Sequence, residues 1–234
     1  THQEPWQTAI ANAGGKVGPS LNDGLSDQAN AFYPVYRWIS DSWLAGDPPL
    51  WNPLIYVGAP ALGNPQAGVL DPQILLLVFF DWLGGQRAFD WALSLAAFLR
   101  LFVAGLGAYL LARRLGLRPM GACLAGLTFG FSGYLILWLN SPLGHVPPLF
   151  PWVLYFLEGL RGHGPGETSP WPARRAFCGV VVAMALTILA GHPETSFFVG
   201  FAAGLWALGI LLRDRRAGLF GLGAMAIGSL AAIP

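Results

Sequence analysis

Residues 89–112 read FDWALSLAAFLRLFVAGLGAYLLA, an apolar run interrupted by Asp90 near its start and by Arg100 near its middle. A helix of about 20 apolar residues is long enough to cross the hydrocarbon core of a bilayer. Of the 234 residues in the chain, 54% are hydrophobic and only 11% are charged, whereas soluble domains carry roughly 25% charge. The sequence therefore predicts a membrane protein.

Further apolar runs follow this one toward the C-terminus. They lie at 120–140, 146–160, 176–190, 195–212 and 217–234. The runs at 146–160 and 176–190 are short for a span. We expect an all-α polytopic membrane protein, with a helical bundle of about six spans over residues 91–234. Because the chain starts at Thr1 and its last apolar run reaches Pro234 without a polar stop, we expect a fragment cut at both ends.

Arginine placement predicts the orientation of the bundle. Three alternate connections carry arginines, namely Arg113, Arg114 and Arg118, then Arg161, Arg174 and Arg175, then Arg213, Arg215 and Arg216. Lys and Arg concentrate in cytoplasmic loops, so these three connections are predicted to be cytoplasmic. Residues 140–145 and 191–194 contain neither and are predicted to be extracytoplasmic, as is the whole segment 1–90.

Segment 1–90 is predicted to be a large extracytoplasmic loop with interfacial helices. Its apolar stretch 74–83 is too short to span, and Trp82 suits a helix at the headgroup level. Residues 48–66 are rich in Pro, Gly and Asn and contain Trp51-Asn52-Pro53. Prolines at this density exclude a helix interior or a central strand, so 48–66 is expected to be an ordered loop, and long ordered loops usually carry function.

Several segments together resemble the YfhO family of bacterial membrane proteins. They are Asp27-Gln28, Tyr33-Pro34, Gly46-Asp47-Pro48-Pro49-Leu50-Trp51-Asn52-Pro53, Asn64-Pro65-Gln66, Phe131-Ser132-Gly133-Tyr134 and Ala190-Gly191-His192-Pro193-Glu194-Thr195. That family is similar to the C-type glycosyltransferases, which use polyprenyl-phosphate sugars. The resemblance implies a multi-pass protein of the bacterial plasma membrane, which transfers a sugar from a polyprenyl-phosphate donor to a cell-envelope acceptor at the outer leaflet.

The resemblance implies an acidic catalytic residue in the first outer loop, and Asp27 aligns with it. A carboxylate there would remove the proton of the acceptor hydroxyl as the bond between sugar and phosphate breaks. The competing interpretation is a solvated aspartate or a helix N-cap. Asp23 is the second candidate, although the adjacent Gly24 suggests a plain turn.

Candidate substrate contacts lie on the same predicted face. His145, His192 and Glu194 fall on short outer connections, where they could bind a phosphate or orient an acceptor. The alternative for His192-Pro193-Glu194 is a helix start, with Pro193 at the first position and Glu194 in the first turn. No residue spacing indicates a metal site, and no cofactor is predicted.

Arg100 and the proline-rich loop supply the other candidate contacts. A charge within a span is costly, so Arg100 should face a cavity, a lipid phosphate or a structural partner. Trp51 and Tyr56 could stack on a sugar face, and Asn52 belongs to the same motif; packing against lipid or the core is the alternative.

Two other classes of protein remain open. A transporter or lipid flippase would show internal repeats and paired charges at mid-membrane, and neither is evident. A non-catalytic envelope-assembly scaffold would use the loop only to dock partners, and the sequence does not distinguish it. No basic stretch with interleaved aromatic residues suggests nucleic-acid binding.

Overall fold

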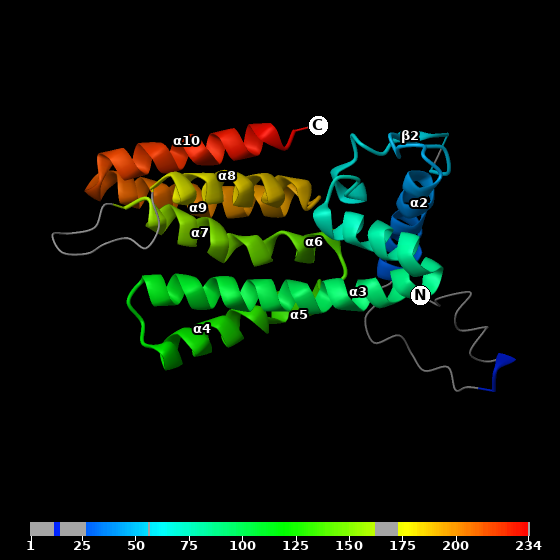
Figure 1. Ribbon diagram of the computed structural model, residues 1–234, viewed down its shortest axis with the longest axis horizontal. Coiled ribbons are helices and arrows are strands. Elements are labelled where there is room, and N and C mark those ends of the chain that lie inside the picture. The colour runs from blue at the N-terminus through cyan, green and yellow to red at the C-terminus, as the bar shows by residue number, and fades with distance from the viewer. Residues whose placement is uncertain (1–11, 15–26, 56, 162–172, 234) are drawn as a thin grey trace.

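The computed structural model describes residues 12–14, 27–55, 57–161 and 173–233, and these are mostly helical. Figure 1 shows an elongated molecule whose long helices run lengthwise, with α2 and the proline-rich loop gathered at one end. The C-terminus lies at the same end.

The loop-side end begins with a short π-helical turn, η2 (Gln28–Phe32), which continues into α2 (Tyr33–Leu44). The proline-rich segment then forms a minimal antiparallel pair, β1 (Trp51–Asn52) with β2 (Ala59–Pro60), and a short helix, η3 (Pro65–Ala67). The segment is therefore ordered, as the sequence predicted.

The longest helix, α3 (Pro72–Arg114), is broken at Gly84 and Gly85. Gly85 has φ +64° and ψ −160°, a conformation open essentially only to glycine, and the chain reverses direction there. The predicted short helix 74–83 is thus the first arm of α3, and the predicted span 89–112 belongs to its second arm. The sequence-based division after residue 90 falls inside that second arm.

Helix α2 is tied to both arms of α3. Arg37 donates to Asp81 at 2.8 Å, Ser40 Oγ donates to the same carboxylate at 2.6 Å, and Tyr33 Oη donates to Asp90 at 2.8 Å. A buried apolar cluster beneath these bonds joins α2, the loop and both arms of α3. Its members are Tyr36, Ile39, Ala61, Ala67, Val69, Ile74, Leu77, Phe89 and Ala92. The loop is consequently packed onto the helices.

The next predicted spans are interrupted. Phe131 and Ser132 separate α4 (Pro119–Gly130) from α5 (Gly133–Leu137). The predicted run 146–160 begins at a chain of short pieces, α6 (Pro142–His145) and η4 (Pro147–Leu149), which lead into α7 (Phe150–Gly159). Prolines at 142, 147, 148 and 151 account for the short pieces, because each removes a backbone donor.

The remaining helices, α8 (Ala173–Leu189), α9 (Pro193–Arg213) and α10 (Arg215–Ala231), pack with α7. Their shared core is made of apolar and small side chains: Val153, Leu154, Leu157, Val180, Ala183, Met184, Ala203, Ala207, Ile210, Ala217, Ala224 and Met225. Many large apolar side chains remain exposed on the outside of these helices, as a lipid-facing surface requires.

Within the described residues, three helical stretches are long and apolar enough to cross a membrane, namely Pro72–Arg114, Pro119–Leu137 and Pro193–Arg213. Helices α8 and α10 have 17 residues each, or about 26 Å of helix, slightly less than the ~30 Å hydrocarbon core. The prediction of a membrane protein is supported, and the larger number of spans remains a prediction.

The arginine-bearing ends of the helices lie together. Arg114 donates to the carbonyl of Tyr155 in α7, and a Cβ at Gly159 would lie 2.8 Å from Arg114 and 3.0 Å from Ala176 of α8. Figure 1 shows the α3–α4 and α9–α10 turns at this same end, opposite the proline-rich loop. The three arginine groups therefore share one end of the molecule, as their alternation along the chain predicted.

Candidate functional site

A buried histidine–carboxylate pair lies where the proline-rich loop meets the helices. His145 Nδ1 is 2.8 Å from Asp71 Oδ2, and the side chains of both residues are only 2% exposed. Asp71 is also the N-cap of α3, because its Oδ1 accepts from the backbone N–H of Gln73 at 2.9 Å. One carboxylate thus holds the start of a helix and a histidine that follows it by 74 positions.

Arg100 lies beside this pair and is 6% exposed. Its Nε donates to Gln73 in the first arm of α3, and its Nη1 donates to the carbonyl of Leu139 and, at 3.4 Å, to Asn140. Among the described residues no carboxylate forms an ion pair with it. Its contacts hold both arms of α3 and the α5–α6 connection together.

Arg100 is nearer to one boundary than the sequence implied. The second arm of α3, residues 86–114, is about 44 Å long at 1.5 Å per residue, which exceeds the ~30 Å hydrocarbon core. Its loop-side part therefore projects beyond the core if Arg113 marks the other boundary. Arg100 then lies level with the α5–α6 connection that it contacts, where a charge costs less than at mid-membrane.

Burial sets the protonation state of the cluster. Burial and then the nearby Arg100 cation lower the pKa of His145, although the hydrogen bond with Asp71 opposes the shift. Burial likewise raises the pKa of Tyr36, whose ring centroid is 6.4 Å from that of His145. The Nε2 atom of His145 and the hydroxyl of Tyr36 are both buried without a hydrogen-bond partner among the described residues.

Asp71, Gln73, Arg100 and His145 line a cavity of about 260 Å³. Apolar residues complete its walls: Pro72, Leu76, Ala96, Leu99, Val103, Pro148, Leu149, Leu186 and Ala190. We call this the polar cavity. A few convergent polar groups in an apolar wall are typical of small-molecule sites.

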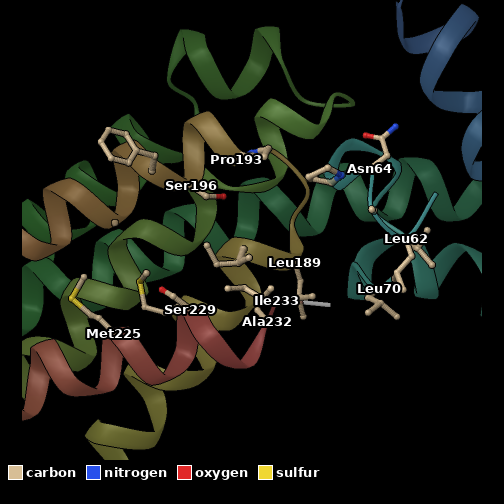
Figure 2. A pocket seen from close by; sticks show the side chains of 18 of the residues that line it. Leu62, Asn64, Leu70, Leu189, Pro193, Ser196, Met225, Ser229, Ala232 and Ile233 are labelled. Atoms are coloured by element: carbon tan, nitrogen blue, oxygen red, sulfur yellow. The ribbon is translucent and has the colours of Figure 1, made fainter. Parts of the chain in front are cut away.

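A larger apolar groove of about 740 Å³ lies on the other side of the last turns of α8. Figure 2 shows Leu62 and Leu70 of the loop facing Leu189 and Ile233, while Ser196 and Ser229 contribute two hydroxyls. The end of α8 separates the two volumes, because Leu189 lines the groove and Ala190 lines the polar cavity. In the segment that follows the loop, Leu70 lines the groove and the next residue, Asp71, lines the polar cavity.

The two described candidate residues of the proline-rich loop, Trp51 and Asn52, are not among the described residues that line either volume. Asn52 is buried, and its Oδ1 accepts from the backbone N–H of Leu54 at 2.9 Å, a local turn contact. Trp51 is 58% exposed and its indole covers Gly58, where a Cβ would lie 2.6 Å from Nε1. Tyr56 lies outside the described residues. Asn52 therefore has a structural role. The indole of Trp51 packs against Gly58 and is otherwise exposed.

His192 is the N-cap of α9, as the helix-start alternative predicted. Its Nδ1 faces the backbone N–H of Thr195 at 3.2 Å and the Thr195 hydroxyl at 2.8 Å, with Pro193 at the first position. Glu194 lies in the first turn and is exposed. The preceding Gly191 has φ +86°, and a Cβ there would lie 2.5 Å from the carbonyl oxygen of Pro65. This close approach brings together two of the segments that suggested the family resemblance.

The acidic candidates of the first loop are not part of this site as described. Asp27 immediately precedes η2, is exposed, and makes no side-chain cap hydrogen bond. It is not among the described residues that line the polar cavity or the groove. Asp23 lies outside the described residues. No group of three or more potential metal-ligating side chains occurs within the described part of the chain.

Two of the residues predicted from the sequence, Arg100 and His145, therefore lie together in this cluster, whereas Asp71, Gln73 and Tyr36 were not predicted. The signal at Asp71 was local: an aspartate directly before Pro72 is a typical N-cap followed by proline at the first helical position. Nothing in the spacing indicated that this aspartate would meet His145.

Comparison with known proteins gives no relative for this chain: no family model, curated protein sequence or solved structure matches it.

Proposed function

We propose that this chain is part of a polytopic glycosyltransferase of the bacterial plasma membrane, which transfers a sugar from a polyprenyl-phosphate donor to a cell-envelope acceptor. The observation that carries the proposal is that an apolar groove and a buried polar cavity flank the same end of α8, beside the proline-rich loop. A lipid-linked sugar has the same two parts, a long apolar tail and a charged, hydroxyl-rich head.

The arginines orient the proposed enzyme. Their three groups lie at the end opposite the proline-rich loop, and arginines favour the cytoplasmic side. The loop, the polar cavity and the mouth of the groove would then face the outer leaflet. Exposed Trp82 and Trp91 near the α3 break suit the outer interface.

The groove supplies the lipid site in this proposal. Its volume falls within the ~300–1,000 Å³ typical of small-molecule pockets. Exposed Phe197 and Phe201 of α9 lie at its edge, so an isoprenoid tail would enter sideways from the bilayer. Arg100 would contact the phosphate, because a guanidinium matches phosphate oxygens and stays charged when buried.

The family resemblance supports the same proposal from independent residues, since two of its segments meet at Gly191 and Pro65. The acidic position Asp27 comes from the resemblance alone. Its exposed position away from the polar cavity makes it the weaker candidate for the reacting carboxylate.

A transfer assay tests the proposal. The full-length protein in phosphatidylethanolamine–phosphatidylglycerol vesicles would receive polyprenyl-phosphate sugars extracted from bacteria fed tritiated hexoses, together with an envelope fraction as acceptor. We expect label to move from the lipid to the envelope fraction with the wild type and not with empty vesicles. Label that stays on the carrier, or only crosses the bilayer, would reject transferase activity, and the second result would identify a flippase.

A further inference from the structure

The buried pair of Asp71 and His145 has a defined proton arrangement. Both carboxylate oxygens of Asp71 accept hydrogen bonds, from the backbone N–H of Gln73 at 2.9 Å and from His145 at 2.8 Å. If the Asp71 carboxylate is ionised, it only accepts, and the proton in the second contact is then on Nδ1 of the imidazole. A neutral imidazole protonated at Nδ1 carries its lone pair on Nε2.

That lone pair has no protein partner. Nε2 of His145 is buried without a hydrogen bond among the described residues, and the hydroxyl of the neighbouring Tyr36 is in the same state. Buried polar atoms without partners are rare, and each requires an explanation, such as a catalytic role. His145 and Asp71 both line the polar cavity, and a ligand hydroxyl that reached Nε2 from there would supply the missing partner.

Arg100 completes the arrangement with an unused donor. Gln73, Leu139 and Asn140 occupy Nε and Nη1, and no hydrogen bond from Nη2 to a described residue is present. The polar cavity is thus lined by a neutral base and by a cation that retains donor capacity.

We propose that His145 is the general base of the transfer reaction, that Asp71 is its positioning residue, and that Arg100 holds the leaving phosphate. This inference rests on the proposed function, and in it His145 takes the place of Asp27 as the base. The acceptor hydroxyl gives its proton to Nε2 while its oxygen forms a bond to the anomeric carbon. The bond between that carbon and the phosphate oxygen breaks, and the polyprenyl phosphate leaves with the electron pair.

The charges balance within the polar cavity. The reaction creates an imidazolium on His145 and one additional negative charge on the leaving phosphate. Asp71 stabilises the first charge across the 2.8 Å contact, and Arg100 stabilises the second. Preorganised groups of this kind, aimed at charge that develops in the transition state, are the usual source of rate enhancement.

Four variants of the full-length protein test this assignment in the transfer assay. His145→Gln should lower kcat by about 10²–10⁴-fold with little change in KM, because it removes the base and spares the lipid site. Asp71→Asn should lower kcat less and move the acid limb of the pH–rate profile to lower pH, because Asp71 raises the pKa of His145. Asparagine is as good an N-cap as aspartate, so the start of α3 is preserved.

The other two variants are comparisons. Asp41→Asn removes an exposed carboxylate that pairs only with Arg37 among the described residues, and transfer should stay normal. Asp27→Asn tests the competing base. Normal transfer by the His145→Gln variant would overturn the assignment. So would a pH–rate profile that loses its acid limb in the Asp27→Asn variant and keeps it in the His145→Gln variant.

A second measurement is independent of transfer and separates this inference from the proposed function. Nitrogen-15 NMR of histidine-labelled wild type, with His145→Gln identifying the signal, should show a neutral imidazole protonated at Nδ1 at pH 7. A proton on Nε2, or an imidazolium, would overturn the base assignment. If transfer is absent while the Nδ1 tautomer is found, the proposed function and the catalytic step fail together, and only the geometry of the pair stands.

Discussion

At the scale of single residues, the proposed chemistry depends on one histidine at the end of a four-residue helix. His145 is held by Asp71, lies near Arg100 and Tyr36, and is closed off from solvent. The sequence indicated His145 and Arg100 as candidates because both are polar residues next to apolar runs. It did not indicate their meeting with Asp71, since contacts between distant residues come from packing rather than from spacing.

The lowered pKa of His145 predicts how transfer depends on pH. A general base works only when it is neutral, so the rate should be constant near pH 7–8 and should fall as acid protonates His145. Because burial and Arg100 lower the pKa and Asp71 only partly opposes them, this fall should lie below pH 6.5, the ordinary value. The pH dependence of kcat/KM in the vesicle assay measures it. An acid limb centred above pH 6.5 would contradict the buried environment described here.

At the scale of elements, some apolar runs in the sequence correspond to continuous helices and others do not. The runs 195–212 and 217–234 correspond to α9 and α10, because neither contains a residue that stops a helix before its end. The run 120–140 is broken at Phe131 and Ser132. Apolarity predicts depth in the membrane but not helix continuity, so this break could not be predicted from hydropathy.

Gly126 of α4 and Gly204 of α9 both lie in apolar helices, and the structure gives them different surroundings. Gly126 packs on α3, where a Cβ would lie 2.7 Å from the carbonyl oxygen of Gly105, whereas nothing lies within 4 Å of a Cβ at Gly204. Gly126→Val should therefore lower the thermal unfolding temperature in detergent, because α3 and α4 must separate. Gly204→Val carries the same change in helix propensity and should have little effect. Equal shifts for the two variants would show that propensity, not packing, is responsible.

At the scale of the whole molecule, the α3–α4 and α9–α10 turns, which carry arginines, lie at one end and the proline-rich loop lies at the other. Cysteine labelling in intact cells tests this polarity, after Cys123 and Cys178, both exposed, are replaced by serine. A cysteine at Asn64 should react with a membrane-impermeant maleimide, and one at Leu117 should react only after the cells are permeabilised. The reverse pattern would invert the protein and move the proposed chemistry to the cytoplasm.

The central claim is that the apolar groove holds the isoprenoid tail of a lipid-linked sugar. Phe201 lines the groove and is 58% exposed, while Phe102 on α3 is 55% exposed and is not among the described residues that line it. The two side chains are therefore about equally exposed, and only Phe201 lies in the groove.

Photocrosslinking from these two positions measures occupancy of the groove directly. A benzoyl-phenylalanine would replace Phe201 or Phe102 in cells fed tritiated hexoses, and the protein would be irradiated, purified and counted for bound label. We expect the residue at position 201 to capture the polyprenyl-phosphate sugar well above the level at position 102, and we expect excess farnesyl phosphate to remove the difference. Equal capture at both positions would contradict a lipid-linked sugar site in the groove.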